Sequence, residues 1–297
     1  MKSNLKVISI LLALFIISQL LGIIILDRNI DIAATKEKGE PVFKKIYIAG
    51  VELEKPKINP TWSFVYIALA VLIGTLLIFG IIKLKLLVLW KLWFFLAAML
   101  CITISLTAFL PSRIALLAGI VLAIYKIFKP NVFIHNLTEP LIYSGIAVIF
   151  VPIINMVSMF ILLILISLYD AYAVWKSKHM ITLAKLQTKT KLFSGMLIPY
   201  TLKRKAKEGL PKQRLTTVKT AILGGGDVAF PLLFTGVIFK GYGFWALLII
   251  PFTALALFLL FYKGKKDKFY PAMPFLSVGC IAGFLLIIML RAIIQLL

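Results

Sequence analysis

The sequence predicts an all-α membrane protein that crosses the bilayer nine times. Hydrophobic residues make up 62% of its 297 positions and charged residues only 15%, and the mean hydropathy is +1.04. Soluble domains carry about 25% charged residues, so a soluble fold is excluded. The apolar residues fall into runs of roughly 20, which is the length of helix that spans the hydrocarbon core of a bilayer.

The expected spans are separated at charges, prolines and turn-forming clusters. They are residues 5–26, 62–82, 86–110, 114–128, 137–151, 153–175, 217–239, 242–262 and 271–296. A single helix over residues 140–175 would be about 54 Å long, well beyond a bilayer core of about 30 Å. A tight turn near Val151 and Pro152 is therefore expected to separate the fifth and sixth spans.

The spans divide the chain into three parts. Residues 1–175 form an N-terminal six-helix half, residues 176–216 a basic loop, and residues 217–297 a C-terminal three-helix half. The first run could also be a cleaved signal peptide, because Lys2 and Lys6 precede it. Its apolar core is longer than the roughly 7 to 15 residues that such signals use, which favours a span.

The net charge of +22 reflects orientation in a membrane. Most Lys and Arg residues lie in the connections on one side, above all in residues 176–219, and none forms the soluble basic face that nucleic-acid binding needs. The positive-inside rule puts the N-terminus and the 176–219 loop in the cytoplasm and the C-terminus outside, in a protein of the cell membrane. The basic loop is expected to hold the topology and contact anionic lipid head groups, with docking of a substrate as the alternative role.

Only two of the 11 acidic residues, Asp170 and Asp227, fall inside expected spans; Glu139 falls at a span edge. Asp170 lies about 9 Å of helix from Lys176, and Asp227 about 12 Å from Lys219. Because the two spans are consecutive and antiparallel, both carboxyl groups are expected at a similar depth and side by side. Acidic groups inside a membrane are costly and usually functional.

Two neighbouring carboxyl groups cannot both ionise easily, so they would share one proton. One group then acts as a base on a bound water, while the other polarises a peptide carbonyl, as in aspartic proteases. The same aspartates would also suit a proton- or cation-coupled transporter or leak channel, which is the alternative from another class. Transporters of that kind usually consist of two similar halves, whereas the two halves of this sequence are not similar.

The stretch AILGGGDVAFPLLF, residues 221–234, surrounds Asp227 with residues that weaken a helix. A protease in the membrane must hold its substrate locally extended and close to its own backbone. Gly224, Gly225 and Gly226 permit that close approach, although close helix packing would also explain them. Pro231 lacks the amide that would bond the carbonyl of residue 227, so a helix is loosened at the aspartate.

The stretch KFYPAMPFL, residues 268–276, contains a third candidate element. A residue before a proline avoids the helical region, so Tyr270 and Met273 are expected to be extended and regular helix to begin near Pro274. The helix that follows is too short to cross the whole bilayer core. The Pro-Ala-Met-Pro segment is therefore expected to lie inside the membrane, towards the aspartates. A plain helix start is the simpler interpretation of the same residues.

Three motifs occur in order on the sixth, seventh and ninth expected spans: Tyr169-Asp170, Gly224-Gly225-Gly226-Asp227 and Pro271-Ala272-Met273. With the number of spans and the long loop after the sixth, they make essentially the whole chain resemble the presenilin and signal peptide peptidase family of intramembrane aspartyl proteases. The second motif has the family's G-x-G-D pattern, whereas the third has Met where the family has Pro-Ala-Leu. The stretch WKSKHMITLAKLQ, residues 175–187, is similar to the prokaryotic, largely archaeal branch.

The resemblance implies that Asp170 and Asp227 are the catalytic pair. It further implies that Tyr169, the three glycines and residues 271–273 shape the site and position the substrate. The implied substrates are transmembrane helices with an outside N-terminus, and the prokaryotic branch implies a protein that works without accessory subunits. Met and Leu have similar volumes, so Met273 is expected to be tolerated, with altered substrate preference or weaker activity left open.

The sequence indicates no metal site and no cofactor. His135 and His179 are the only histidines, both are expected in loops, and the zinc-binding motif H-E-x-x-H is absent from the sequence. The serine-protease motif G-x-S-G is absent from the sequence as well. Cys101 and Cys280 fall inside apolar runs and are expected to be packing residues. Prepilin-type peptidases share G-x-G-D but lack the later Pro-Ala-Leu element, which makes them a second, less favoured protease alternative.

Overall fold

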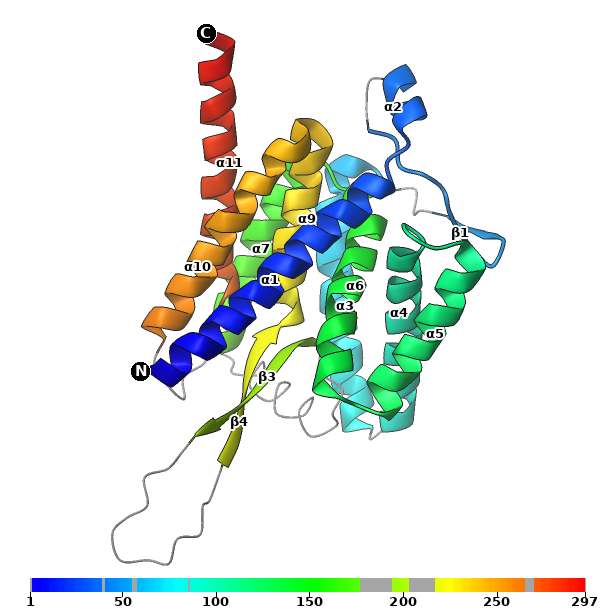
Figure 1. The fold of residues 1–297 in the computed structure, drawn as a ribbon, viewed down its shortest axis with the longest axis vertical. Helices are drawn as coiled ribbons and strands as arrows, with labels where there is room; N and C mark the ends of the chain where they lie inside the picture. The colour runs from blue at the N-terminus through cyan, green and yellow to red at the C-terminus, as the bar shows by residue number, and fades with distance from the viewer. Residues whose placement is uncertain are drawn as a thin grey trace, which may run out of the picture.

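Long apolar helices follow one another along the chain and pack into a bundle (Figure 1). The computed structural model describes residues 2–38, 41–54, 58–84, 86–176, 194–202, 217–264 and 270–296. In chain order the long helices are α1 (Lys2–Arg28), α3 (Ser63–Lys83), α4 (Leu87–Leu106), α5 (Ser112–Phe128), α6 (Val132–Phe150), α7 (Met156–Trp175), α9 (Gly225–Tyr242), α10 (Ile249–Lys263) and α11 (Met273–Leu296). Lipid offers no partners to backbone groups, so a spanning segment satisfies them within its own helix.

Shorter elements connect these helices. They are α2 (Ile32–Lys38), β1 (Ile46–Ile48), β2 (Val51–Leu53), the 3-10 turns η1 (Pro60–Trp62), η2 (Val151–Ile153) and η3 (Gly243–Leu248), and the strands β3 (Gly195–Leu202) and β4 (Thr217–Gly224). Cys101 and Cys280 are buried and unpaired, which confirms their prediction as packing residues.

The predicted class, an all-α protein with many spans, is confirmed. Each of the nine expected spans overlaps one of the long helices. By length and composition, seven stretches of the described chain qualify as membrane spans. One of them, Gly225–Lys263, joins α9, η3 and α10, and α5 has only 17 residues. The number nine therefore stays a prediction.

The turn expected near Val151 and Pro152 is confirmed. Here η2 (Val151–Ile153) is followed by Ile154 with extended backbone, at φ −99° and ψ 129°. Asn155 then caps α7, and its side-chain oxygen accepts the Ser158 amide at 2.7 Å. An asparagine in this position satisfies an amide that has no partner within the helix. The turn thus ends one span, and the capped helix begins the next.

The prediction that a helical span begins at residue 217 is wrong. Residues 217–224 form β4, which pairs antiparallel with β3 from Gly195↔Gly224 to Leu202↔Thr217. The sequence TVKTAILG is rich in β-branched residues, which suit a strand, and pairing satisfies backbone groups that a helix would otherwise have to satisfy. Two parts of the predicted basic loop, residues 177–193 and 203–216, lie outside the described residues.

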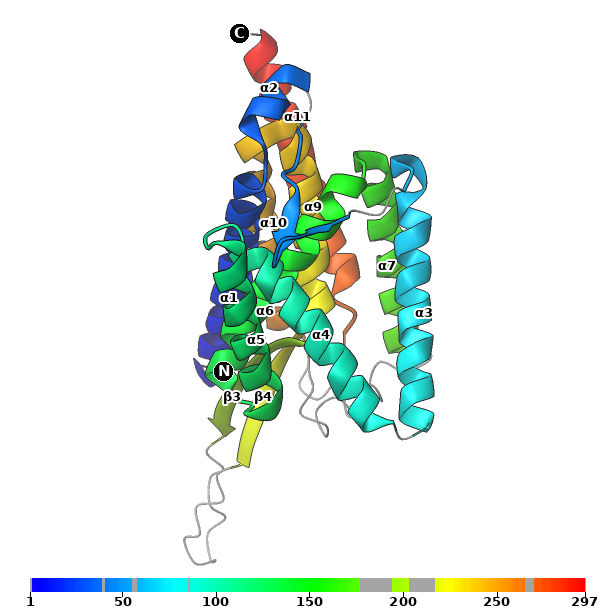
Figure 2. The same cartoon turned by 90° about the vertical axis from the view of Figure 1, so that its right-hand side faces the viewer.

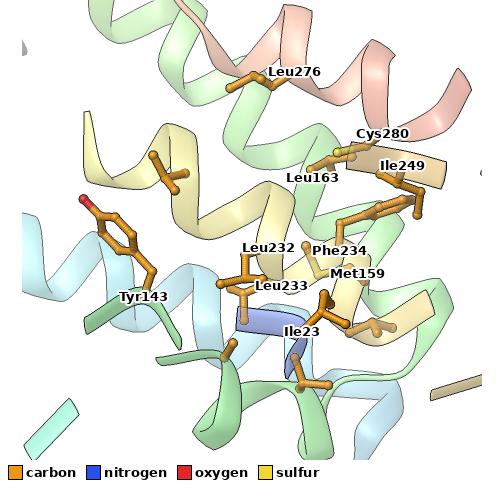
Figure 3. Close-up of a cluster of buried hydrophobic side chains, with 14 of the residues drawn as sticks. Ile23, Tyr143, Met159, Leu163, Leu232, Leu233, Phe234, Ile249, Leu276 and Cys280 are labelled. Atoms are coloured by element: carbon orange, nitrogen blue, oxygen red, sulfur yellow. The ribbon is translucent and has the colours of Figure 1, made fainter. Parts of the chain in front are cut away.

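The β3–β4 hairpin and the N-terminus lie at one end of the bundle, and the C-terminus lies at the other (Figure 1). The same arrangement is visible after a quarter turn (Figure 2). The helix that carries Asp227, α9, packs against α1, α6, α7 and α11. Figure 3 shows its buried side chains among residues of these neighbours, including Ile23, Tyr143, Met159, Leu163 and Cys280. The central position of α9 holds its first turn between other helices.

We expect Gly145→Ala to destabilise the protein by about 1–3 kcal/mol, as overpacking of a tight contact typically does. A Cβ at Gly145 would overlap the backbone carbonyl of Cys101, so α4 and α6 would have to separate. Gly74→Ala is the matched control, because a Cβ at that position meets nothing within 4 Å. Thermal unfolding of the purified variants in one detergent checks the difference. Equal melting temperatures would contradict this account of the α4–α6 contact.

Candidate active site

Asp170 lies in the last two turns of α7, and its side chain points into the protein with 6% of the residue exposed. Its Oδ2 accepts the backbone amide of Met273 at 3.0 Å, and the amide of Ala272 also hydrogen-bonds this carboxyl group. Met273 is the first residue of α11. A carboxylate at a helix N-terminus is favoured by the unpaired amides and by the helix dipole. Asp170 therefore binds the start of α11 to the end of α7.

The Pro271-Ala272-Met273 segment is buried against Asp170, close to where its sequence predicted it. Tyr270 lies outside the helix as expected, but Met273 is helical, so the predicted extended backbone at Met273 is wrong by one residue. Pro274 is tolerated in the first turn because its position has no intrahelical amide bond to lose. The contact to Asp170 comes from the backbone of Met273, so a leucine there would donate the same hydrogen bond.

Asp227 is in the first turn of α9 and is partly exposed. The backbone of Gly224 hydrogen-bonds its carboxyl group, and a Cβ on Gly224 would lie 3.0 Å from its Oδ2. The helices α7 and α9 pack against each other, and the carboxyl groups of Asp170 and Asp227 interact electrostatically. The structure thus brings the two predicted acids together.

The three glycines before Asp227 differ in what surrounds them. Gly224 ends β4 and borders the carboxyl group of Asp227. Gly225 is buried, and a Cβ there would lie 2.7 Å from Ser194 Oγ and 3.2 Å from Tyr143 Oη. Gly226 is exposed, and its Cβ would meet only Phe230 at ordinary contact distance, 3.7 Å or more. Close contacts with the protein itself therefore restrict the first two glycines, and the predicted approach of a substrate to the glycine backbone stays a prediction.

Tyr169 and Pro231 lie on the same helices as the two aspartates. Tyr169 is half-buried on α7, next to Asp170. Pro231 lies inside α9, one turn after Asp227, as the sequence indicated. Within the described ranges, no three His, Cys, Asp or Glu side chains gather in a way that could hold a metal ion.

Comparison with known proteins gives the family of the chain. The family model described as signal-peptide peptidase, presenilin aspartyl protease matches residues 12–293. The chain belongs to this family. Two solved structures of a presenilin family intramembrane aspartate protease, in space groups C222 and P2, are similar to it. Their TM-scores are 0.60 and 0.54 at 18% and 20% identity, over 95% and 93% of this chain and 99% and 96% of theirs. None of the curated proteins compared with the chain matches it.

In this presenilin-family protein, we expect Gly225→Ala to lower the rate of peptide cleavage about tenfold. Overpacking at this turn needs to raise the activation free energy by only about 1.4 kcal/mol to give that effect. The added methyl group would press on Ser194 and Tyr143 and displace the turn that carries Asp227. Gly241→Ala is the control, since a Cβ at that position near the end of α9 meets nothing within 4 Å. Cleavage rates at saturating substrate test this, and equal rates for the two variants would contradict it.

The sequence interpretation missed a polar cluster beside the site. The expectations of His135 in a loop and of Glu139 at a span edge are both wrong. Lys126 belongs to α5, His135 and Glu139 belong to α6, and all three residues are buried. One signal was available: His135, Glu139 and Tyr143 recur at four-residue spacing, which places them on one face of a helix.

Proposed function

We propose that this protein is an intramembrane protease in which Asp170 and Asp227 hydrolyse peptide bonds of transmembrane helices. The observation that supports the proposal is the electrostatic interaction of the Asp170 and Asp227 carboxyl groups on the packed helices α7 and α9, in a chain of the presenilin aspartyl protease family. Tyr169, Gly224, Gly225, Gly226 and residues 271–273 are proposed to shape this site. The Asp227 motif has the G-x-G-D pattern.

In the proposed reaction, the two carboxyl groups hold one proton and one water between them. The ionised group takes a proton from the water, whose oxygen attacks the carbonyl carbon of the substrate peptide bond. The protonated group hydrogen-bonds the carbonyl oxygen as it becomes negative. A proton then passes to the amide nitrogen, the C–N bond breaks, and a carboxylic acid and an amine leave. No metal ion or cofactor takes part in these steps.

The substrate has to unwind before it can react, because a helix hides each peptide bond in its own hydrogen-bond ladder. We propose that the substrate is an extended segment of a transmembrane helix with an outside N-terminus. The charge distribution supports a cytoplasmic N-terminus and 176–219 loop in the cell membrane, in contact with anionic lipids. The hairpin and the N-terminus also share one end of the bundle (Figure 1). Accessory subunits are not required in this proposal.

Reconstitution tests the function. The purified protein is placed in liposomes with a synthetic transmembrane peptide, and products are followed by mass spectrometry while a pH-sensitive dye reports proton flux. We expect two complementary fragments and no protein-dependent flux. An intact peptide together with acid-dependent ion flux would overturn the proposal in favour of the transporter alternative, which no observation on the family or the fold supports.

A further inference from the structure

A buried ion pair lies beside the proposed active site and takes no part in the reaction described above. Lys126 Nζ of α5 is 2.6 Å from Glu139 Oε1 of α6, and their side chains are 1% and 0% exposed. His135 Nδ1 lies 3.3 Å from the same ammonium group, and Thr138 Oγ1 accepts a hydrogen bond from it at 3.2 Å. Burying two charges gains little stability over an apolar pair of the same size, so another role has to be considered.

The cluster holds one edge of β3. Glu139 Oε2 accepts the backbone amide of Gly195 at 3.2 Å, and His135 Nε2 is 2.6 Å from the Gly195 carbonyl oxygen. The neighbouring Asn136 binds both backbone groups of Leu197, with distances of 2.7 and 2.9 Å. Side chains of α6 thus occupy the backbone groups on the edge of β3 that faces away from β4.

The other edge of β3 pairs with β4, and the turn that carries Asp227 follows β4 in the chain. Gly195 is paired with Gly224 in the hairpin, and the amide of Gly225 donates to the carbonyl of Ser194 at 3.2 Å. Asp227 follows two residues later. Tyr143, one turn beyond Glu139 on α6, lies beside Gly225 and close to the carboxyl groups of both Glu139 and Asp227. Figure 3 shows Tyr143 next to the first turns of α9.

We propose that Lys126, Glu139 and His135 are positioning residues for Asp227. Lys126 engages one oxygen of the Glu139 carboxylate and orients the other towards the Gly195 amide. Hydrogen bonds to charged groups are stronger and more directional than neutral ones. The network therefore fixes the start of β3 on α6, and through the Gly195↔Gly224 pair it fixes the turn that presents Asp227 to Asp170. This inference rests on the proposed function.

The test removes both charges together. Lys126→Met with Glu139→Leu leaves no buried charge unpaired and keeps the volume, so the fold is expected to persist. We expect kcat for the transmembrane peptide to fall about tenfold with KM nearly unchanged, as loss of one charge-assisted hydrogen bond at the site would give. Hydrogen exchange of the amides in residues 194–199 and 221–227 is expected to rise about tenfold, while exchange in α4 and α10 stays as in the wild type.

A rescue variant and a control isolate the positioning role. Lys126→Met with Glu139→Gln keeps an acceptor for the Gly195 amide, so it should recover most of the kcat and the exchange protection. Lys45→Gln with Glu52→Gln removes an exposed ion pair at the other end of the bundle, 3.0 Å across, and should change neither readout.

Three results would overturn the inference. The first is wild-type kcat and wild-type exchange in the Met/Leu variant. The second is a uniform rise in exchange over all helices with a lower melting temperature, which would indicate a purely structural role. The third is failure of the Gln variant to recover exchange protection. If the wild-type protein cleaves no peptide, the proposed function fails, and the exchange data alone still decide whether the network holds the turn at Asp227.

Discussion

Asp170→Asn and Asp227→Asn are each expected to lower kcat for peptide cleavage by at least about 10³-fold, the upper range for loss of a group that transfers protons in the transition state. Asparagine has the shape of aspartate but can neither take nor give the proton. It keeps a side-chain oxygen, so at position 170 it still accepts the Met273 amide and holds the start of α11. We therefore expect both variants to stay folded and inactive, measured as cleavage rate and melting temperature in the same preparation.

Asp27→Asn is the matched control for these two variants, because Asp27 is exposed near the end of α1. Its cleavage rate is expected to equal that of the wild type. If either Asp170→Asn or Asp227→Asn retained more than about a tenth of the wild-type rate, proton transfer by that carboxyl group would be dispensable, and the two-carboxyl mechanism would be wrong.

The second large effect concerns stability. Glu139→Leu alone is expected to destabilise the protein by about 3–5 kcal/mol, because it leaves the ammonium group of Lys126 buried without its counter-charge. Removing both partners, as in Lys126→Met with Glu139→Leu, is expected to cost much less, since no buried charge remains. Equilibrium unfolding in mixed detergent micelles measures the free energy of unfolding of the wild type, of Glu139→Leu and of the double variant under one condition.

Glu52→Leu serves as the comparison, because it breaks the exposed pair with Lys45. Solvent compensates an exposed charge, so no measurable change in stability is expected. The account of the buried pair would be contradicted if Glu139→Leu unfolded together with Glu52→Leu, or if the double variant were as unstable as Glu139→Leu alone.

Much of the architecture could be predicted from the order of residues, because a bilayer imposes one simple requirement. Each spanning segment satisfies its own backbone, so apolar runs of a given length predict helices. The turn near Pro152 follows from the same length argument. The sequence predicts Asp170 and Asp227 as a pair because acids inside spans are rare and because their distances from the flanking lysines agree. None of these inferences requires knowing which other segment a given segment packs against.

The strands could not be predicted in that way. β4 became a strand because β3, whose paired residues lie 15 to 29 positions earlier, supplies its hydrogen bonds. Without a known partner, TVKTAIL is as apolar as the span that it precedes. The glycines show the same dependence. Ser194 and Tyr143, which are distant in sequence, crowd Gly225 and leave Gly226 free, so spacing alone could not distinguish the two.

The sequence by itself determined that this is a multi-span helical membrane protein and placed Asp170 and Asp227 on consecutive spans, since both follow from local hydropathy and charge, but it left out Glu139, the fully buried acid on α6. Only the tertiary structure decided that Met273 binds Asp170 through its backbone and that Gly195 joins Lys126, His135 and Glu139 to the turn before Asp227. Those contacts join segments between 56 and 103 residues apart. Their existence depends on how helices pack, which hydropathy along the chain does not encode.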